Sequence, residues 1–158
     1  DPTTVHTAWR PYQSLEPTLV HRRARHRIEK EVVLFRDGAN LLEGQSVVLD
    51  RLSSAILNAH DAAQTLGYAL DVQVRGHHSS DGSEAVNRRL ATERATFVRS
   101  ALRQRGVPVS ILQPVSAVGV PIHPGIAGTE EGRTYNRGVT LRVALRETPP
   151  AASTSDSG

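Results

Sequence analysis

The chain has 158 residues and no cysteine, so its length suits one domain with flanking segments, and disulfides and thiolate metal sites are excluded. No apolar run approaches the roughly eighteen residues that a membrane-spanning helix needs. The formal net charge is +3, but the four arginines of the run 21–27 contribute +4, so the remainder is nearly neutral, which disfavours a nucleic-acid-binding domain.

The first half of the chain predicts a lead-in, a strand, a helix and a second strand. Residues 1–30 hold prolines and the basic run, and we interpret them as an extended lead-in with a short helix around residues 18–29. A strand is expected over residues 31–36. Apolar residues then recur at helical spacing up to about His60. Residues 68–75 alternate between apolar and polar, which indicates a strand with one buried face.

The second half predicts a long helix, two strands and a loop. Apolar residues at three-to-four spacing indicate a helix over about residues 83–105, with Ser83 as its N-cap. Strands are expected over residues 111–118 and 139–145, and the proline- and glycine-rich segment 119–138 between them is expected to be a loop.

This order of elements, β-α-β-α-β-loop-β, predicts an α+β fold. Helices with one apolar stripe and strands with one apolar face favour a two-layer α/β sandwich, a mixed sheet with the helices on one face. The crossover that links the first two strands is expected to be parallel and right-handed. We therefore divide the chain into a basic lead-in (1–30), one domain (31–146) and a disordered tail (147–158).

The strongest indication of a binding site is a charged side chain on the apolar face of the second helix. Arg94 lies four residues after Leu90 and four before Val98, and Asn87 lies seven before Arg94, so both point with the core stripe. Burying an unpaired guanidinium is costly, so Arg94 requires a partner from the protein, from water or from a ligand. The polar segment 76–82 just before the helix provides the neighbourhood of such a site.

Several motifs with defined spacing run through the same region. They are Val74-Arg-Gly-His77, Gly82-Ser83, Asn87-x-x-Leu90-Ala91-x-x-Arg94-Ala95-x-x-Val98, Leu102 and Gly106-Val107, flanked by Phe35-x-x-Gly38-Ala-Asn-Leu41 and Gly132-Arg133-x-x-Asn136-Arg137-x-Val139. Together they resemble the OmpA C-terminal-like family, which includes the peptidoglycan-associated lipoprotein and the periplasmic part of the flagellar stator. The resemblance covers about residues 31–146 and implies a periplasmic, non-enzymatic domain of the cell envelope without a cofactor.

The resemblance also implies a ligand. The family holds peptidoglycan non-covalently through the diaminopimelate of the stem peptide, with an Asp in the loop after Gly-His and an Arg on the following helix. An Arg fork suits the carboxylate of that amino acid and an Asp suits its ammonium. Carried over by position, the Arg is Arg94 and a supporting Asn is Asn87. The Asp position is occupied by Ser79, and the second Arg of the family's last motif is replaced by Gly138.

Three interpretations of Ser79 remain open. Asp81 could take the place of the missing carboxylate, or Arg94 could bind an anionic ligand alone and more weakly. In the third, ligand binding is lost, Arg94 pairs with Asp81 or Asp37, and the domain is a structural module. Such a module would contact other proteins of an envelope-spanning secretion or pilus assembly.

Other chemistries have weaker support in the sequence. His77, His78 and His123 lack the spacing of a metal site, and His77 is better interpreted as a residue that structures the loop. No nucleophile elbow or other catalytic motif is present, so an enzyme is not expected. The basic run could attract anionic lipid or acidic groups of the cell wall, although such runs are more often solvated linkers. A lipid or transmembrane anchor before Asp1 would fix the topology of the chain.

Overall fold

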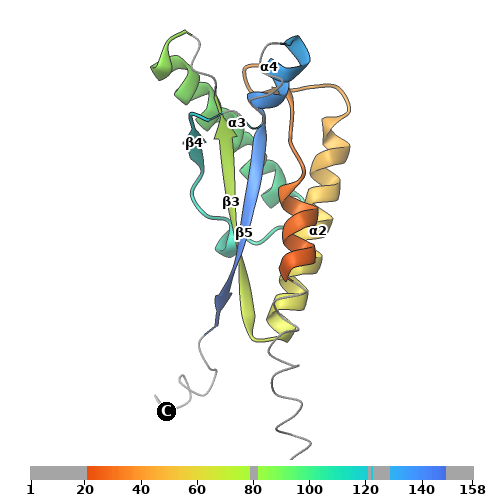
Figure 1. The fold of residues 1–158 in the computed structure, drawn as a ribbon. Coiled ribbons are helices and arrows are strands. Elements are labelled where there is room, and N and C mark those ends of the chain that lie inside the picture. The colour runs from red at the N-terminus through yellow and green to blue at the C-terminus, as the bar shows by residue number, and fades with distance from the viewer. Residues whose placement is uncertain (1–20, 79–81, 121, 123–128, 149–158) are drawn as a thin grey trace, which may run out of the picture.

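The computed structural model describes residues 21–78, 82–120, 122 and 129–148 (Figure 1). A helix covers residues 21–29. The elements that follow are β1 (Phe35–Asp37), β2 (Asn40–Leu41), α2 (Gln45–Thr65), β3 (Tyr68–His77), α3 (Glu84–Gln104), the 3-10 turn η1 (Val109–Ile111), β4 (Ser116–Val118), α4 (Glu130–Asn136) and β5 (Val139–Glu147). Among the described residues, no helix is long and apolar enough to cross a lipid bilayer.

The main sheet is mixed and has β3 at its centre. β4 pairs with β3 in parallel on one side, and β5 pairs with β3 antiparallel along its length on the other. Val33 adds an isolated antiparallel bridge to Val139, while β1 and β2 form a separate two-stranded hairpin. The segment that leads into β1 therefore lies beside β5, and β5 separates it from β3.

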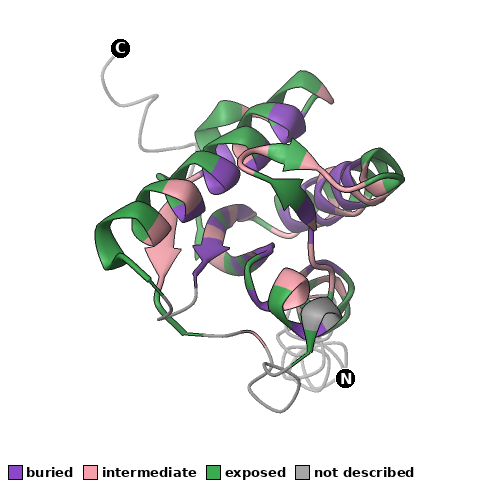
Figure 2. Cartoon of the chain, turned by 90° about the horizontal axis from the view of Figure 1, so that it is seen from above, coloured by how far each residue is buried: buried purple, intermediate pink, exposed green. Residues whose placement is uncertain are grey.

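One face of this sheet carries the core, and α2 and α3 pack on it (Figures 1 and 2). Alternate residues of β3 and β5 are buried there, whereas the residues between them are polar and more exposed. The core is aliphatic, and its fully buried members include Leu52, Ile56, Val72, Val98 and Leu141. The predicted α+β fold with a mixed sheet and packed helices is confirmed.

Helix α3 is defined at both ends by local chemistry. The Ser83 hydroxyl accepts a hydrogen bond from the Val86 N–H at 3.4 Å, as expected of an N-cap. At the other end Gly106 has a φ of 97°, and the Val107 N–H donates to the Leu102 carbonyl at 3.1 Å, as in a Schellman motif. Both ends agree with the predicted bounds, so the position of Arg94 along the helix is well determined.

Three predicted elements differ from the observed ones. The first strand begins at Phe35 rather than at residue 31, and the α2 helix continues five residues beyond His60. The predicted strand 111–118 is a short 3-10 turn, an isolated bridge at Leu112 and then β4. Pro114 lies between bridge and strand, and its lack of an N–H explains the interruption.

The segment expected to be a loop, 119–138, contains helix α4. Its N-cap is Thr129, whose hydroxyl accepts from the Gly132 N–H at 2.8 Å. Residues 21–29 are helical, in agreement with the short helix expected within the lead-in, and Ile28 is fully buried.

Candidate functional site

Arg94 projects from α3 toward two backbone segments that are distant in sequence. Its Nε donates to the Gly38 carbonyl at 2.6 Å, and its Nη1 donates to the Arg137 carbonyl at 3.4 Å. Gly38 lies in the turn between β1 and β2, and Arg137 follows α4. The site is therefore built where this turn, α3 and the end of α4 meet.

The guanidinium of Arg94 is buried against an aromatic ring. The residue is 7% exposed, and its Cζ lies 5.7 Å from the centroid of the Phe35 ring, within cation–π range. Phe35 in turn makes an edge-to-face contact with Phe97 of α3. Burial, and then the nearby positive charge of Arg137, lower the pKa of Arg94, while Asp37 and Glu93 act in the opposite direction.

Within the described residues, Arg94 forms no ion pair with a carboxylate. The Asp37 carboxylate accepts from the Asn40 amide at 2.7 Å and lies 3.8 Å from Arg36, so it is not the direct partner of Arg94. A guanidinium has five N–H donors, and two of those of Arg94 are used. Three therefore have no acceptor in the described part of the chain. Asp81, the other predicted partner, and Ser79, at the family's Asp position, lie outside the described residues.

Two further predicted site residues, Asn87 and His77, lie in the described part of the chain. Asn87 is half-buried on α3, two helical turns before Arg94. His77 ends β3 and contacts a different region, because its Nδ1 donates to the Val120 carbonyl at 3.0 Å and its Nε2 lies 2.7 Å from the Thr140 hydroxyl. The structure thus assigns His77 to holding the segment after β4, and it does not bring His77 to Arg94.

The contacts from Gly38, Arg137 and Phe35 were not predicted as part of the site. All three nevertheless belong to the two flanking motifs of the sequence, Phe35-x-x-Gly38 and Asn136-Arg137. Two of them act through backbone carbonyls, which no side-chain pattern can indicate. The described residues contain no group of three side chains able to hold a metal ion.

Comparison with known protein families identifies the family to which the chain belongs. The sequence profile of the OmpA family matches residues 37–137, which is more than half of the chain. The chain belongs to the OmpA family. OmpA-family domains are non-enzymatic modules associated with peptidoglycan, so membership confirms the prediction of a non-enzymatic domain. No curated protein sequence matches the chain.

Solved structures with the OmpA-like fold agree with this assignment. The peptidoglycan-associated lipoprotein of Burkholderia pseudomallei has a TM-score of 0.57 and 22% identity, covering 72% of this chain and 89% of its own. The C-terminal domain of Helicobacter pylori MotB has a TM-score of 0.55 and 22% identity, covering 80% and 90%. The OmpA-like domain of FopA1 from Francisella tularensis has a TM-score of 0.54 and 18% identity, covering 75% and 74%. At these identities the likeness shows the fold alone.

One departure of this OmpA-family chain has a structural explanation. Gly138 stands where the family's last motif has its second Arg. A Cβ at this position would lie 2.6 Å from the Val32 Cγ1 and 2.8 Å from the Val33 carbonyl oxygen. The segment that leads into β1 therefore passes too close to residue 138 for any side chain, which accounts for the glycine.

Proposed function

We propose that this chain is an envelope domain that associates non-covalently with peptidoglycan through the diaminopimelate of the stem peptide. The observation that supports the proposal is the buried Arg94 guanidinium, which has two carbonyl acceptors and no carboxylate partner among the described residues. A ligand carboxylate would accept from the remaining N–H groups in a charge-assisted fork. Family membership supports peptidoglycan as the source of that carboxylate. The periplasm is the compartment that this function requires.

We further propose that the interaction is weaker than in relatives that keep the family Asp. Ser79 cannot neutralise the ligand ammonium. Losing one charge-assisted contact costs about 1.5–3 kcal/mol, which corresponds to roughly a ten- to hundredfold loss of affinity. Asp81, two residues further on, is the candidate substitute, and Asn87 is the candidate orienting partner.

A second function, a structural module that does not bind peptidoglycan, is favoured by one observation. The Nε of Arg94 is only 2.6 Å from the Gly38 carbonyl, so this arginine also ties α3 to the β1–β2 turn. In that role it would hold the surface that contacts other envelope proteins, such as those of a secretion or pilus assembly.

Sedimentation with purified sacculi separates the two functions. The wild-type chain should pellet with sacculi, and Arg94→Ala should not, because the carboxylate loses its fork. Arg99→Ala is the matched control, since Arg99 lies on the same helix and also donates only to carbonyls, those of Gln113 and Leu112. Both substitutions remove a helix-to-backbone tie, but only Arg94→Ala removes the proposed anchor.

Ser79→Asp is the companion variant. It should raise the pelleted fraction by restoring the contact to the ammonium, by roughly tenfold or more in affinity. If wild type and Ser79→Asp both stay in the supernatant, the structural module is the correct function. Equal loss in the Arg94 and Arg99 variants would show that the helix tie, and not the anchor, matters.

A further inference from the structure

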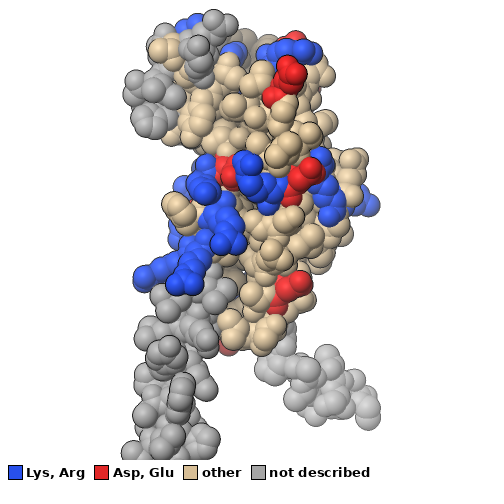
Figure 3. Space-filling model, turned by 90° about the vertical axis from the view of Figure 1, so that its right-hand side faces the viewer, with Lys and Arg blue, Asp and Glu red and all other residues tan. Residues whose placement is uncertain are grey.

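The helix over residues 21–29 has an outer surface made only of basic residues. At 3.6 residues per turn its outward positions follow one another around about 140° of the helix circumference. They are Arg22, His26, Arg23 and Arg27 of the helix and Lys30 of the turn after it, and all are exposed. Arg25 is also exposed but pairs with Glu29. Figure 3 shows Lys and Arg side chains gathered on this side of the molecule, with acidic side chains scattered among them. We call these five residues the basic helix face.

The basic helix face differs in its ion pairing from several other arginines of the described residues. Elsewhere on the surface arginines have carboxylate partners, as in Arg51–Glu31 at 2.9 Å and Arg105–Asp50 at 2.8 Å. Within the described residues, no cation of the basic helix face has such a partner. The one acidic residue of the helix, Glu29, is used by Arg25 and by the Val143 N–H. Four like charges thus lie close together without a carboxylate partner in the described part of the chain, and an anionic surface would relieve their repulsion.

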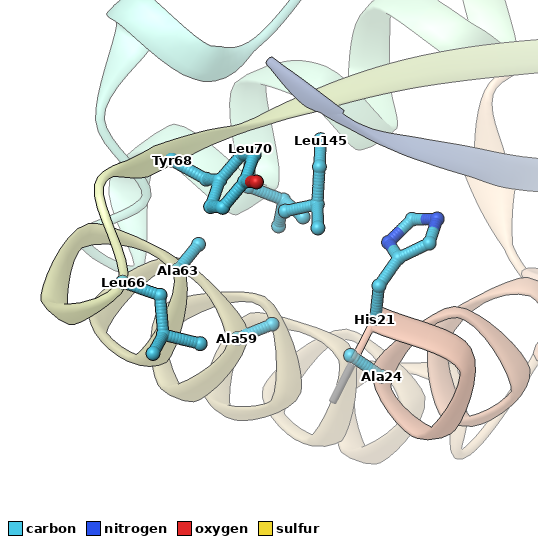
Figure 4. A pocket seen from close by; sticks show the side chains of 8 residues that line it. All are labelled: His21, Ala24, Ala59, Ala63, Leu66, Tyr68, Leu70 and Leu145. Carbon is cyan, nitrogen blue, oxygen red and sulfur yellow. The ribbon is translucent and has the colours of Figure 1, made fainter. Parts of the chain in front are cut away.

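The opposite side of the helix fixes this face in place. Ile28 is fully buried in the core, and the Glu29 carboxylate accepts from the β5 backbone at 3.0 Å. His21 and Ala24 line a small pocket together with Ala59 and Ala63 of α2 (Figure 4). The helix is therefore part of the folded body, and its cations are presented by a rigid support rather than by a solvated linker.

The shape of the basic helix face indicates the kind of anion. Its outward positions hold no apolar side chain that could serve as an anchor, and the face is a convex helix surface rather than a pocket. A single carboxylate is better held by one oriented guanidinium such as that of Arg94. Several cations on one exposed face can each approach a different phosphate of a flat, closely spaced array, and each contact adds to the attraction.

We propose that the basic helix face docks on the anionic phospholipid surface of a membrane. This proposal takes the periplasmic compartment from the proposed function, because a domain in the periplasm lies between the cell wall and a membrane. The β1–β2 turn and α4, which hold Arg94, lie at one end of the molecule, and the basic helix lies away from that end beside α2 (Figure 1). One domain can therefore contact the wall and a membrane at the same time.

Vesicle sedimentation with the full chain tests the proposal. Wild type should pellet with vesicles of phosphatidylcholine plus phosphatidylglycerol and not with phosphatidylcholine alone. Replacing Arg22, Arg23, Arg27 and Lys30 by Gln should weaken binding by about tenfold or more. Raising the salt from about 0.1 M to about 1 M should abolish it, because the Debye length falls from about 10 Å to about 3 Å.

The matched control removes the same net charge at other exposed positions, by replacing Arg36, Arg88, Arg89 and Arg103 with Gln. Its binding should change by less than about twofold, because these residues lie on β1 and α3 and not on the basic helix face. Equal weakening in both variants, or equal binding to neutral vesicles, overturns the proposal. The proposal is also overturned if the helix variant no longer binds sacculi or duplex DNA but still binds the vesicles. The Arg94→Ala variant should bind vesicles as the wild type does. Failure of the proposed peptidoglycan site can therefore be distinguished from failure of the proposed membrane contact.

Discussion

At the Arg94 side chain, two N–H groups donate to carbonyls of Gly38 and Arg137, and the other three have no acceptor among the described residues. The two internal bonds orient the plane of the guanidinium, and Phe35 lies beside it at 5.7 Å. The charge is thus positioned before any ligand arrives, which lowers the entropy cost of binding. A lysine would keep the charge but not the fork.

His77 makes stability depend on pH. Burial lowers its pKa below the ordinary histidine value, and a carbonyl acceptor requires the proton to sit on Nδ1. The unfolded chain therefore takes up a proton first, near pH 6.5, so stability is complete above that pH and falls as pH decreases through it. Urea unfolding should show wild type losing more stability than His77→Gln between about pH 7.5 and about pH 5.5. Parallel pH profiles for the two proteins would contradict this role.

The burial of Arg94 was predictable from residue spacing, but its partners were not. Its position between Leu90 and Val98 places it on the apolar stripe, and it is buried as predicted. Its acceptors are backbone oxygens, 56 and 43 residues away in the chain. Backbone groups carry no residue signature, and contacts at such separations depend on the complete fold. The family resemblance indicated the right motifs but not these atoms.

Among the elements, those with a strong periodic pattern were predicted well and the short ones were not. α3 and β3 agree closely with their predicted bounds because long stripes and caps define them. α4 has only seven residues and lies in a segment rich in proline and glycine, so periodicity could not reveal it. Its signal was the Thr129 cap followed by two glutamates.

The close packing of α3 on β3 yields a stability prediction. A Cβ on Gly76 would lie 2.0 Å from the Ala91 carbonyl oxygen, so Gly76→Ala must push the helix from the strand. We expect destabilisation of about 1–3 kcal/mol in urea unfolding followed by circular dichroism. Gly119→Ala is the control, since its Cβ would meet only the His78 ring, at 3.2 Å. Equal stabilities for the two variants would show that the helix does not pack this closely.

On the scale of the whole molecule, we propose that two cationic features serve different partners. Arg94 is a single buried charge in a narrow setting, suited to one carboxylate, while the basic helix face is an exposed set of charges suited to an extended anionic surface. Elsewhere in the described part of the chain some arginines pair with carboxylates, as Arg51 and Arg105 do, and the net charge of +3 arises from the basic run. Under the two proposals, a nearly neutral domain binds anions at two separate places.

We propose above all that Arg94 binds the carboxylate by which diaminopimelate differs from lysine. Calorimetric titration of the chain with two soluble muropeptides, identical except for diaminopimelate or lysine in the stem, isolates that group. We predict that the diaminopimelate form binds about ten- to a hundredfold more tightly, and that Arg94→Ala removes the difference. Equal affinity of the wild-type chain for the two muropeptides, or a preference that survives in Arg94→Ala, would contradict the claim.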